Sequence, residues 1–385
     1  MLQRYEFVVL ASQSGIAFNE LCRRFNISRK TGYKWLDRFE GGGVEALQDR
    51  SKKPVNSPRK VAECVAQTVI ALRLENPVWG GRKLRRRLQD LGHKEVPSAS
   101  TCTEILRRAD LLKKDAPRGP LKRFERCEPN ELWQLDHKGD FATQSGQRCH
   151  PLTALDDHSR FNLILDPATD QRTATVQTAL REAFERYGLP EAILCDNGAP
   201  WGNLKNGTGY TELTVWLLRL GVRVLHGRPY HPQTQGKEER FHRTLNHELL
   251  ARHTWRDVAH CAQEFPRYRQ RYNCERPHDS LDGDTPASRY QPSVRALPSK
   301  LPDLEYPGMQ VREVRSKGVI TFGNQTWLIG AAFASLPIGL RPSPQADGQW
   351  EVYFSFFKLG ELDLTTRPYA KHILRSLSPF ISPKD

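Results

Sequence analysis

Apolar residues four positions apart mark a helix in the second half of the chain. From residue 235 onward, Phe241, Leu245 and Leu249 fall on one helical face. Two prolines and a glycine in the segment before it favour a loop. A wheel with roughly 100° per residue places Glu238 about 20° from the centre of the apolar stripe and Glu239 about 120° from it. We therefore expect Glu239 to point away from the core.

The middle of the chain alternates between strand-like and helical patterns. Strands are expected over 131–141, 149–157, 160–166, 191–195 and 222–226, and helices over 172–187, 211–220 and 255–273. Three strands come first, and strands and helices alternate after them. This order predicts a mixed sheet flanked by helices.

Residues 2–39 read as three helices, with a three-residue turn between the second and the third. Ser28 is placed to cap the third helix. Two short helices joined by a tight turn are typical of a helix-turn-helix unit, although a hairpin used only for packing has the same pattern. In a helix-turn-helix unit the residues that read base edges would be Arg29, Lys30, Tyr33 and Lys34.

A second helical group is expected over 61–75, 82–91 and 99–109, with Ser98 as the cap of the last helix. Five cations crowd its middle helix and cannot all be core residues, which favours phosphate contacts. The DNA contacts expected in this group are Arg82, Lys83, Arg85, Arg86, Arg87, Ser100 and Thr101.

The last third of the chain has the pattern of an all-β domain. A hairpin is predicted over 319–329 with a two-residue turn at Gly323 and Asn324. Apolar and polar residues then alternate over 350–356, as in a half-buried strand. We expect a small β-barrel over 308–370.

These patterns predict a multidomain protein with all-α helix-turn-helix domains, an α/β core with a mixed sheet and a small β-barrel. The expected boundaries are 1–48 and 60–112 for the helical domains, 49–59 and 113–130 for basic linkers, 131–290 for the core, 308–370 for the barrel and 371–385 for a tail.

Charge narrows the choice of partner. The net charge is +14, and residues 1–130 hold 27 Lys and Arg against 15 Asp and Glu. An excess confined to one third of the chain favours nucleic acid over an evenly solvated surface. No run reaches the roughly 18 apolar residues of a membrane span, and the first residues lack the pattern of a signal peptide. We expect a cytoplasmic location and no membrane partner.

Three acids stand where elements begin or end. Asp136 ends a strand-like stretch, Asp196 follows another, and Glu239 lies on the first turn of the helix described above. A hard divalent cation needs several such oxygen ligands. Each acid alone has an ordinary explanation, because Asp136 could end a strand, Asp196 could open an Asn-Gly turn and Glu239 could face a helix dipole.

The three acids occur together with the run His231-Pro-Gln-Thr-Gln-Gly-Lys-x-Glu239-Arg-Phe-His242. In this combination the chain resembles the insertion-sequence transposases of the retroviral-integrase-like superfamily. The resemblance implies an RNase H-like core in which Asp136, Asp196 and Glu239 are catalytic and hold two Mg²⁺ ions, with Mn²⁺ as a substitute. Asp136 would bridge both ions. Water would free the 3′ ends of the element, and strand transfer would join these ends to target DNA.

The resemblance also implies partners and location. These are the terminal repeats of the element, target DNA and a homo-oligomer assembled on DNA, in a bacterial cytoplasm and associated with the nucleoid. A DNA-binding regulator with an inactive core is the alternative, and a nuclease without strand transfer is a third reading. Lys237, Arg240 and Arg243 are expected to touch phosphates, with plain solvation as the alternative.

Several residues near the motif have more than one reading. His231 and His242 could assist proton transfer or satisfy a loop. Asp156 and Asp157 are rival acids in a turn to which the resemblance assigns a structural role. Glu238 stands where relatives usually have an apolar residue.

Overall fold

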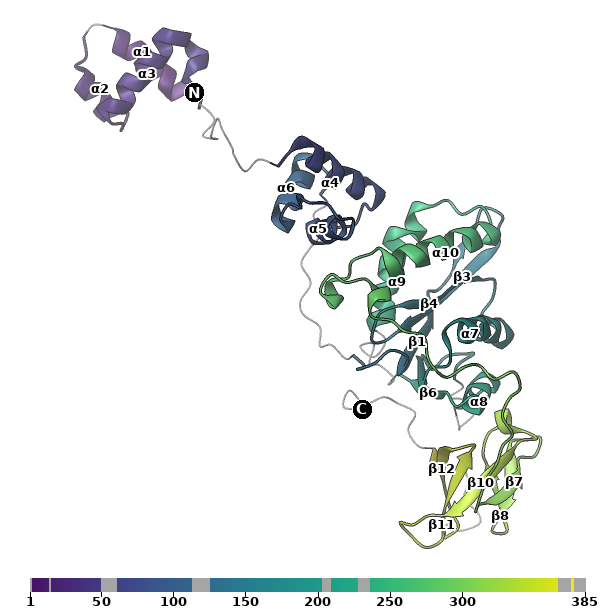
Figure 1. Cartoon of the computed structure of the whole chain (residues 1–385). Helices are drawn as coiled ribbons and strands as arrows, with labels where there is room; N and C mark the ends of the chain where they lie inside the picture. The colour runs from purple at the N-terminus through teal and green to yellow at the C-terminus, as the bar shows by residue number, and fades with distance from the viewer. Residues whose placement is uncertain are drawn as a thin grey trace. The chain divides into compact units, whose positions relative to one another are not determined.

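A computed structural model describes residues 2–13, 15–49, 61–112, 125–202, 209–227, 236–365 and 375–376 (Figure 1). They form two compact units, Met1–Val61 and Ala62–Asp385. The expected linkers, the tail and the loop with His231 lie wholly or largely outside the described residues. No described helix is both long and apolar enough to cross a membrane.

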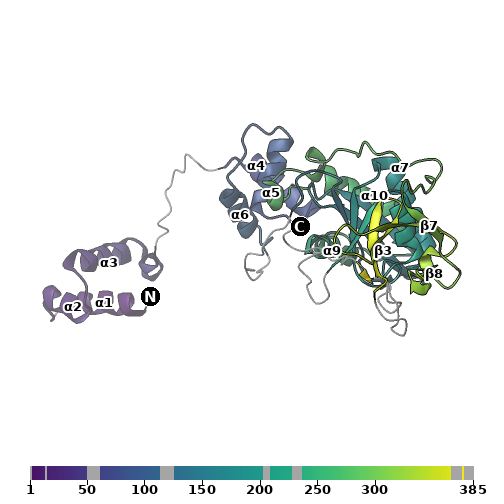
Figure 2. The ribbon, with the colours of Figure 1, turned by 90° about the horizontal axis from the view of Figure 1, so that it is seen from below.

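The first unit is a bundle of three helices, α1 (Leu2–Ser12), α2 (Phe18–Arg24) and α3 (Arg29–Gly42), followed by the short helix η1 (Val44–Leu47) (Figure 2). Ser28 caps α3 by accepting a hydrogen bond from the Thr31 amide at 3.2 Å. A Cβ at position 32 would lie 2.9 Å from ring atoms of Phe7 and Phe18, so these rings would have to move to admit a larger residue than Gly32. The three predicted helices and the cap are confirmed.

The second unit begins with α4 (Glu63–Glu75), α5 (Gly81–Asp90) and α6 (Ala99–Arg108). Ser98 caps α6 through the Thr101 amide, as predicted. A Cβ on Gly81 would lie 2.3 Å from the carbonyl oxygen of Ala99, so α5 and α6 begin in close backbone contact.

The core is a mixed sheet. Its strands are β1 (Leu132–His137), β2 (Phe141–Ala142), β3 (Arg148–Asp156), β4 (Asn162–Ala168), β5 (Ala192–Cys195) and β6 (Arg223–His226). β3 pairs antiparallel with β1, β2 and β4, whereas β5 pairs parallel with both β1 and β6. The predicted mixed sheet is confirmed. The parallel pairing brings the carboxyl ends of β1 and β5 to one edge.

Helices cover both faces of this sheet (Figure 1). On one face, Trp133 and Leu135 of β1 pack with α7 (Thr173–Tyr187) and α8 (Glu212–Arg219). On the other, Leu155 and Leu165 pack with α9 (Gly236–Glu248) and α10 (Val258–Cys274). Because strand side chains alternate, Gln134 and Asp136 lie on the face that α9 covers. Short helices η4 (Leu250–Arg252), η5 (Asp279–Leu281) and η6 (Pro286–Ser288) flank and follow α10.

The C-terminal region differs from the predicted barrel. Its strands are β7 (Gln310–Glu313), β8 (Val319–Phe322), β9 (Gln325–Leu328), β10 (Pro337–Pro342), β11 (Gln349–Phe354), β12 (Phe357–Asp363) and β13 (Arg375–Ser376), with η7 (Ala331–Phe333) between β9 and β10. The β8–β9 hairpin is confirmed, with positive φ at Gly323 and Asn324, as a tight two-residue turn requires.

The barrel itself is not confirmed. β13, β12, β11, β10 and β7 form an open antiparallel sheet, and the hairpin is a separate two-stranded sheet. The edge strands β7 and β13 do not pair with each other, so no sheet of the described C-terminal residues closes. The two sheets instead share one apolar core, to which α8 contributes Val215 and Leu218.

Candidate active site

The orientation of α9 decides which of its two neighbouring acids meets solvent. Phe241, Leu245 and Leu249 are buried against the sheet, as predicted. Glu238 is 0% exposed, whereas Glu239 is exposed on the first turn of the helix. The prediction that Glu239 points away from the core is confirmed, and Glu239 is therefore the acid that a solvent-borne cation can reach.

Asp136 lies near the end of β1, opposite Thr153 of β3, and is partly buried. Burial, together with the negative charges of Asp196 and Glu239, raises the pKa of its carboxyl to about 7. The fold thus brings three acids, 60 and 43 positions apart in sequence, close enough for their charges to interact. Such mutual repulsion favours a site that takes up a cation.

Asp196 follows β5 in an exposed turn. Its Oδ1 accepts a hydrogen bond from the Gly198 amide at 3.0 Å, and its carbonyl oxygen lies 2.8 Å from Nδ1 of His226. Asn197 donates to the carbonyl oxygen of Gly227 at 2.9 Å. These contacts fix the backbone of the turn at the edge where β1 also ends.

The donor set fits a hard divalent cation, because all three side chains offer carboxylate oxygens. Their present arrangement is more open than a filled metal site. Among the described residues, no three His, Cys, Asp or Glu side chains are close enough together to hold a metal ion. Asp196 and Glu239 are exposed, and their side chains are therefore free to change rotamer.

Thr153 is a residue that the sequence did not single out. Its Oγ1 lies 3.0 Å from Oε2 of Glu238, 2.7 Å from Nε2 of His242 and 3.1 Å from the carbonyl oxygen of Asp136. It links the buried side of α9 to the strand that carries Asp136. Its signal in the sequence was weak, since a threonine in a strand is ordinary.

His242 and Glu238 lie beside Asp136 without forming ion pairs with each other. Burial, with Lys138 and His137 nearby, lowers the pKa of His242 to about 3. Its ring is neutral near pH 7, so its 3.9 Å approach to Asp136 is a polar contact. Burial, with the Asp136 charge, raises the pKa of Glu238 well above its usual range, which favours the protonated acid.

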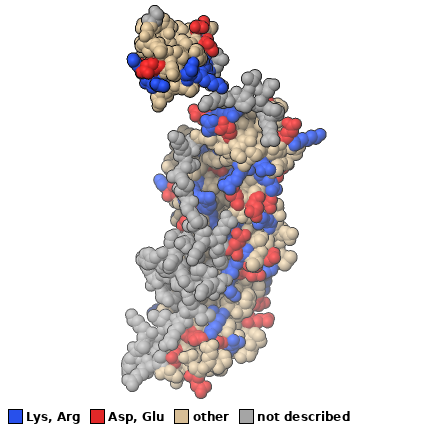
Figure 3. Space-filling view, turned by 90° about the vertical axis from the view of Figure 1, so that its left-hand side faces the viewer, with Lys and Arg blue, Asp and Glu red and all other residues tan. Residues whose placement is uncertain are grey.

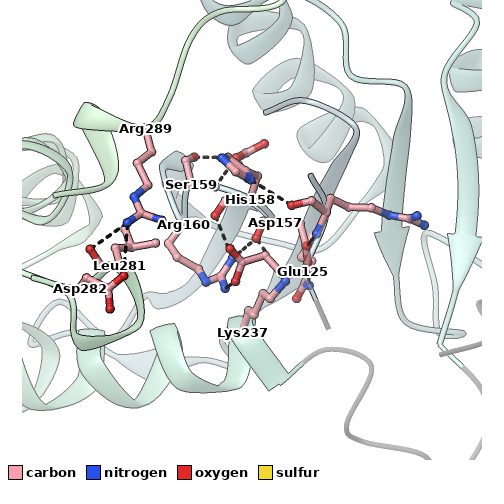
Figure 4. A network of polar contacts seen from close by, with 12 residues as sticks. Glu125, Asp157, His158, Ser159, Arg160, Lys237, Leu281, Asp282 and Arg289 are labelled. Carbon is pink, nitrogen blue, oxygen red and sulfur yellow. Dashed lines mark hydrogen bonds and ion pairs between the residues drawn. The ribbon is translucent and has the colours of Figure 1, made fainter. Parts of the chain in front are cut away.

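The rival acids Asp156 and Asp157 are fully buried and fully engaged. Asp156 accepts hydrogen bonds from the amides of Asn130 and Ser159 and from the Ser159 hydroxyl. Asp157 pairs with Lys237 at 2.5 Å (Figure 4).

The expected DNA contacts of the first unit are accessible. Arg29, Lys30, Tyr33 and Lys34 are all exposed on α3, and the ring of Tyr33 stacks on Phe18 with 4.3 Å between centroids. The first two turns of α3 therefore present cations and one aromatic side chain to solvent.

The cations of α5 have a different environment. Arg82, Arg86 and Arg87 pair with acids of the core segment 275–284. The N···O distances are 3.7 Å to Asp279, 3.1 Å to Asp284 and 2.8 Å to Glu275, respectively. Positive and negative residues are interspersed over the face that Figure 3 presents.

The other contacts expected near α5 and on α9 vary in exposure. Burial, together with the positive charge of Arg276, lowers the pKa of Lys83 to about 8. Arg85, Ser100 and Arg240 are exposed, and Thr101 and Arg243 are partly buried. Lys237 is turned toward Asp157 instead of toward solvent.

Family models match the chain in five places. Two models of the integrase core domain match residues 126–232 and 220–286. A homeodomain-like domain matches 31–106, and a helix-turn-helix domain matches 3–54. The C-terminal domain of the IS481 family transposases matches 309–369.

Two relatives encoded by insertion elements match this chain over only part of their own length. An uncharacterized 31.7 kDa protein of insertion element IS407 from Burkholderia multivorans is 28% identical over 156 residues, which are 40% of this chain and 53% of that protein. An uncharacterized 39.2 kDa protein of IS476 from Xanthomonas euvesicatoria is 26% identical over 220 residues, which are 54% of this chain and 60% of that protein. This chain thus spans between half and two thirds of each relative.

Among solved structures, the HTLV-2 integrase catalytic core domain in complex with magnesium matches 43% of this chain and 99% of that chain. Its identity is 15% and its TM-score 0.33. The core-domain and C-terminal-domain matches and the insertion-element relatives support an insertion-sequence transposase of the retroviral-integrase-like superfamily.

Proposed function

We propose that the chain is a DNA transposase. It binds the terminal repeats of its element, cleaves the 3′ ends by metal-dependent hydrolysis and joins them to target DNA by strand transfer. One observation carries this proposal: the parallel strands β1 and β5 end at one sheet edge, where Asp136, Asp196 and Glu239 are close enough for their charges to interact.

Asp136, Asp196 and Glu239 would hold two Mg²⁺ ions, with Mn²⁺ as a substitute. Two such ions would neutralise charge on the attacking and leaving oxygens of a phosphodiester. Asp136 must lose its proton to serve, which the raised pKa opposes below about pH 7 in the metal-free protein. Asp196 and Glu239 are exposed and can approach from solvent.

The remaining groups bind and orient DNA. The exposed cations of α3 suit base edges and phosphates, and Arg240 lies one residue after Glu239 on the exposed part of α9. Arg82, Lys83, Arg85, Arg86, Arg87, Ser100, Thr101, Lys237 and Arg243 complete the proposed DNA contacts. Joining two ends requires at least two copies of the chain, so the active form is a homo-oligomer assembled on DNA in the cytoplasm, at the bacterial nucleoid.

A nicking and strand-transfer assay tests this function. The purified chain is incubated with duplexes carrying the flanking repeats of its element and a target plasmid, in Mg²⁺ or in EDTA. The proposal predicts Mg²⁺-dependent release of 3′ ends and joined products. Binding of the repeats without any nick in Mg²⁺ or Mn²⁺ would instead identify a DNA-binding regulator, and nicking without joined products would identify a nuclease.

A further inference from the structure

We propose that Asp157 is a positioning residue for the metal site, because it ties the helix that carries Glu239 to the strand that carries Asp136. The inference rests on the proposed function, since it concerns the same acids. The effect of Asp157 passes through Lys237 and Gln134, which its carboxylate contacts directly.

The Asp157 carboxylate is held in one place. It is 0% exposed, and its Oδ2 accepts a hydrogen bond from the Arg126 amide at 2.8 Å. Its own amide donates to the carbonyl oxygen of Leu132 at 2.9 Å. Arg160 contacts the Asp157 carbonyl oxygen and pairs with Glu125 at 2.5 Å. A charge fixed by this many partners can define the position of a second element.

That second element is α9. Lys237 extends from its first turn to Asp157, with Nζ 2.5 Å from Oδ1 and 3.1 Å from the carbonyl oxygen (Figure 4). Its side chain is only 15% exposed. Residues two apart on a helix point about 200° from each other, so a hold on Lys237 turns Glu239 to the opposite, exposed side.

The same carboxylate also reaches β1. Gln134 donates from Nε2 to Oδ1 of Asp157 at 2.6 Å. Gln134 and Asp136 are two apart on the strand and share one face. Asp157 therefore holds one side chain two positions before Asp136 on β1 and one side chain two positions before Glu239 on α9.

The charge of Asp157 is the necessary feature. Lys237 brings a buried ammonium, whose pKa is lowered to about 8 because burial outweighs the opposing charge of Asp157. A neutral amide at 157 keeps the shape but gives this ammonium a much weaker partner. The first turn of α9 would then lose its rotational anchor, while the apolar contacts of Phe241 and Leu245 would still hold the helix on the sheet.

The test uses the full chain with Asp157→Asn, Lys237→Met, Lys237→Arg and the double variant Asp157→Asn/Lys237→Met. Mn²⁺ binding without DNA is measured by calorimetry, and nicking is measured across Mg²⁺ concentrations. The control is Asp282→Asn, whose side chain is 96% exposed.

We expect Asp157→Asn and Lys237→Met each to weaken Mn²⁺ binding and to raise the half-saturating Mg²⁺ concentration by about 10- to 100-fold. Lys237→Arg should restore most of the wild-type behaviour. The double variant should be no worse than the poorer single variant, because both remove one interaction. Asp282→Asn should match the wild type.

If the wild type cleaves DNA, three results would overturn the inference. These are unchanged metal binding in both single variants, losses in the double variant that multiply, and a loss of thermal stability with no change in metal dependence. If Asp157→Asn does not fold, Lys237→Met and Lys237→Arg decide alone. A wild type that never nicks DNA would overturn the proposed function, and this inference with it.

Discussion

Two acids, the buried Asp157 just after β3 and the partly buried Asp136 on β1, have opposite surroundings. Asp157 receives an ammonium and two N–H donors. Asp136 has Asp196 and Glu239 as neighbours, and its pKa is raised to about 7. The comparison teaches that partners, more than residue type, separate an acid that holds the fold from an acid prepared for a cation.

The largest expected effect is the loss of catalysis when Asp136 is replaced. Asp136→Asn should lower Mg²⁺-dependent nicking by roughly a thousandfold or more, since groups that act as a unit fail together. Binding of the repeats should stay within a few-fold of wild type in a gel-shift measurement. A variant that keeps a tenth or more of the wild-type rate would remove Asp136 from the site.

Glu238 and Asp157 are both 0% exposed. We nevertheless expect their replacement by leucine to change the free energy of unfolding in opposite directions. Glu238 has an Oε1 atom with no hydrogen-bond partner among the described residues. Glu238→Leu should therefore raise the free energy of unfolding by about 1–3 kcal/mol, whereas Asp157→Leu should lower it by a similar amount or more. Denaturant titration of both variants measures this. Equal signs would break the comparison.

The raised pKa of Asp136 predicts a pH dependence of stability. The native state keeps this proton up to about pH 7, whereas the unfolded chain loses it near pH 3.8. The stability of the metal-free wild type should therefore fall as pH rises through this window and change no further above it. Asp136→Asn should lack this fall, so its melting temperature in EDTA should exceed that of wild type by more at pH 8 than at pH 5. A difference that is constant with pH would contradict the assigned shift.

The contrast between a side chain without a charged partner in the described part of the chain and one that already has a partner also applies to the expected DNA contacts, where the effects should be smaller. Lys34 is exposed on α3, whereas Arg87 already pairs with Glu275 at 2.8 Å. Lys34→Ala should weaken binding of the repeats a few-fold and reduce the salt dependence by about one charge. Arg87→Ala should change the salt dependence less. The reverse order, in binding measured between low and moderate salt, would show that α5 leaves the core when DNA binds.

Local sequence patterns predicted most helices and strands, but they did not predict whether the C-terminal strands close into a barrel. The helical period placed Phe241 in the core and Glu239 outside it, and the cap at Ser28 depends only on neighbours in sequence. The open C-terminal sheet could not be predicted in this way, because closing a barrel depends on the pairing of distant edge strands.

The candidate acids were predicted from spacing and motif, but the residues that hold them were not. Gln134, Asp157 and Lys237 meet from three elements, and a buried polar contact leaves no period in the sequence. The contacts of Thr153 could not be predicted from the sequence for the same reason. Lys237, expected beside phosphates, has a buried carboxylate as its partner, and its proposed contact with DNA awaits a test.

The central claim is that Glu239, and not its neighbour, completes the acid site with Asp136 and Asp196. The most direct measurement compares Glu239→Gln with Glu238→Gln in the Mg²⁺-dependent nicking and strand-transfer assay, with binding of the repeats measured in parallel. We predict that Glu239→Gln abolishes both reactions and still binds DNA, while Glu238→Gln remains active. Loss of activity in Glu238→Gln with an active Glu239→Gln would contradict the account.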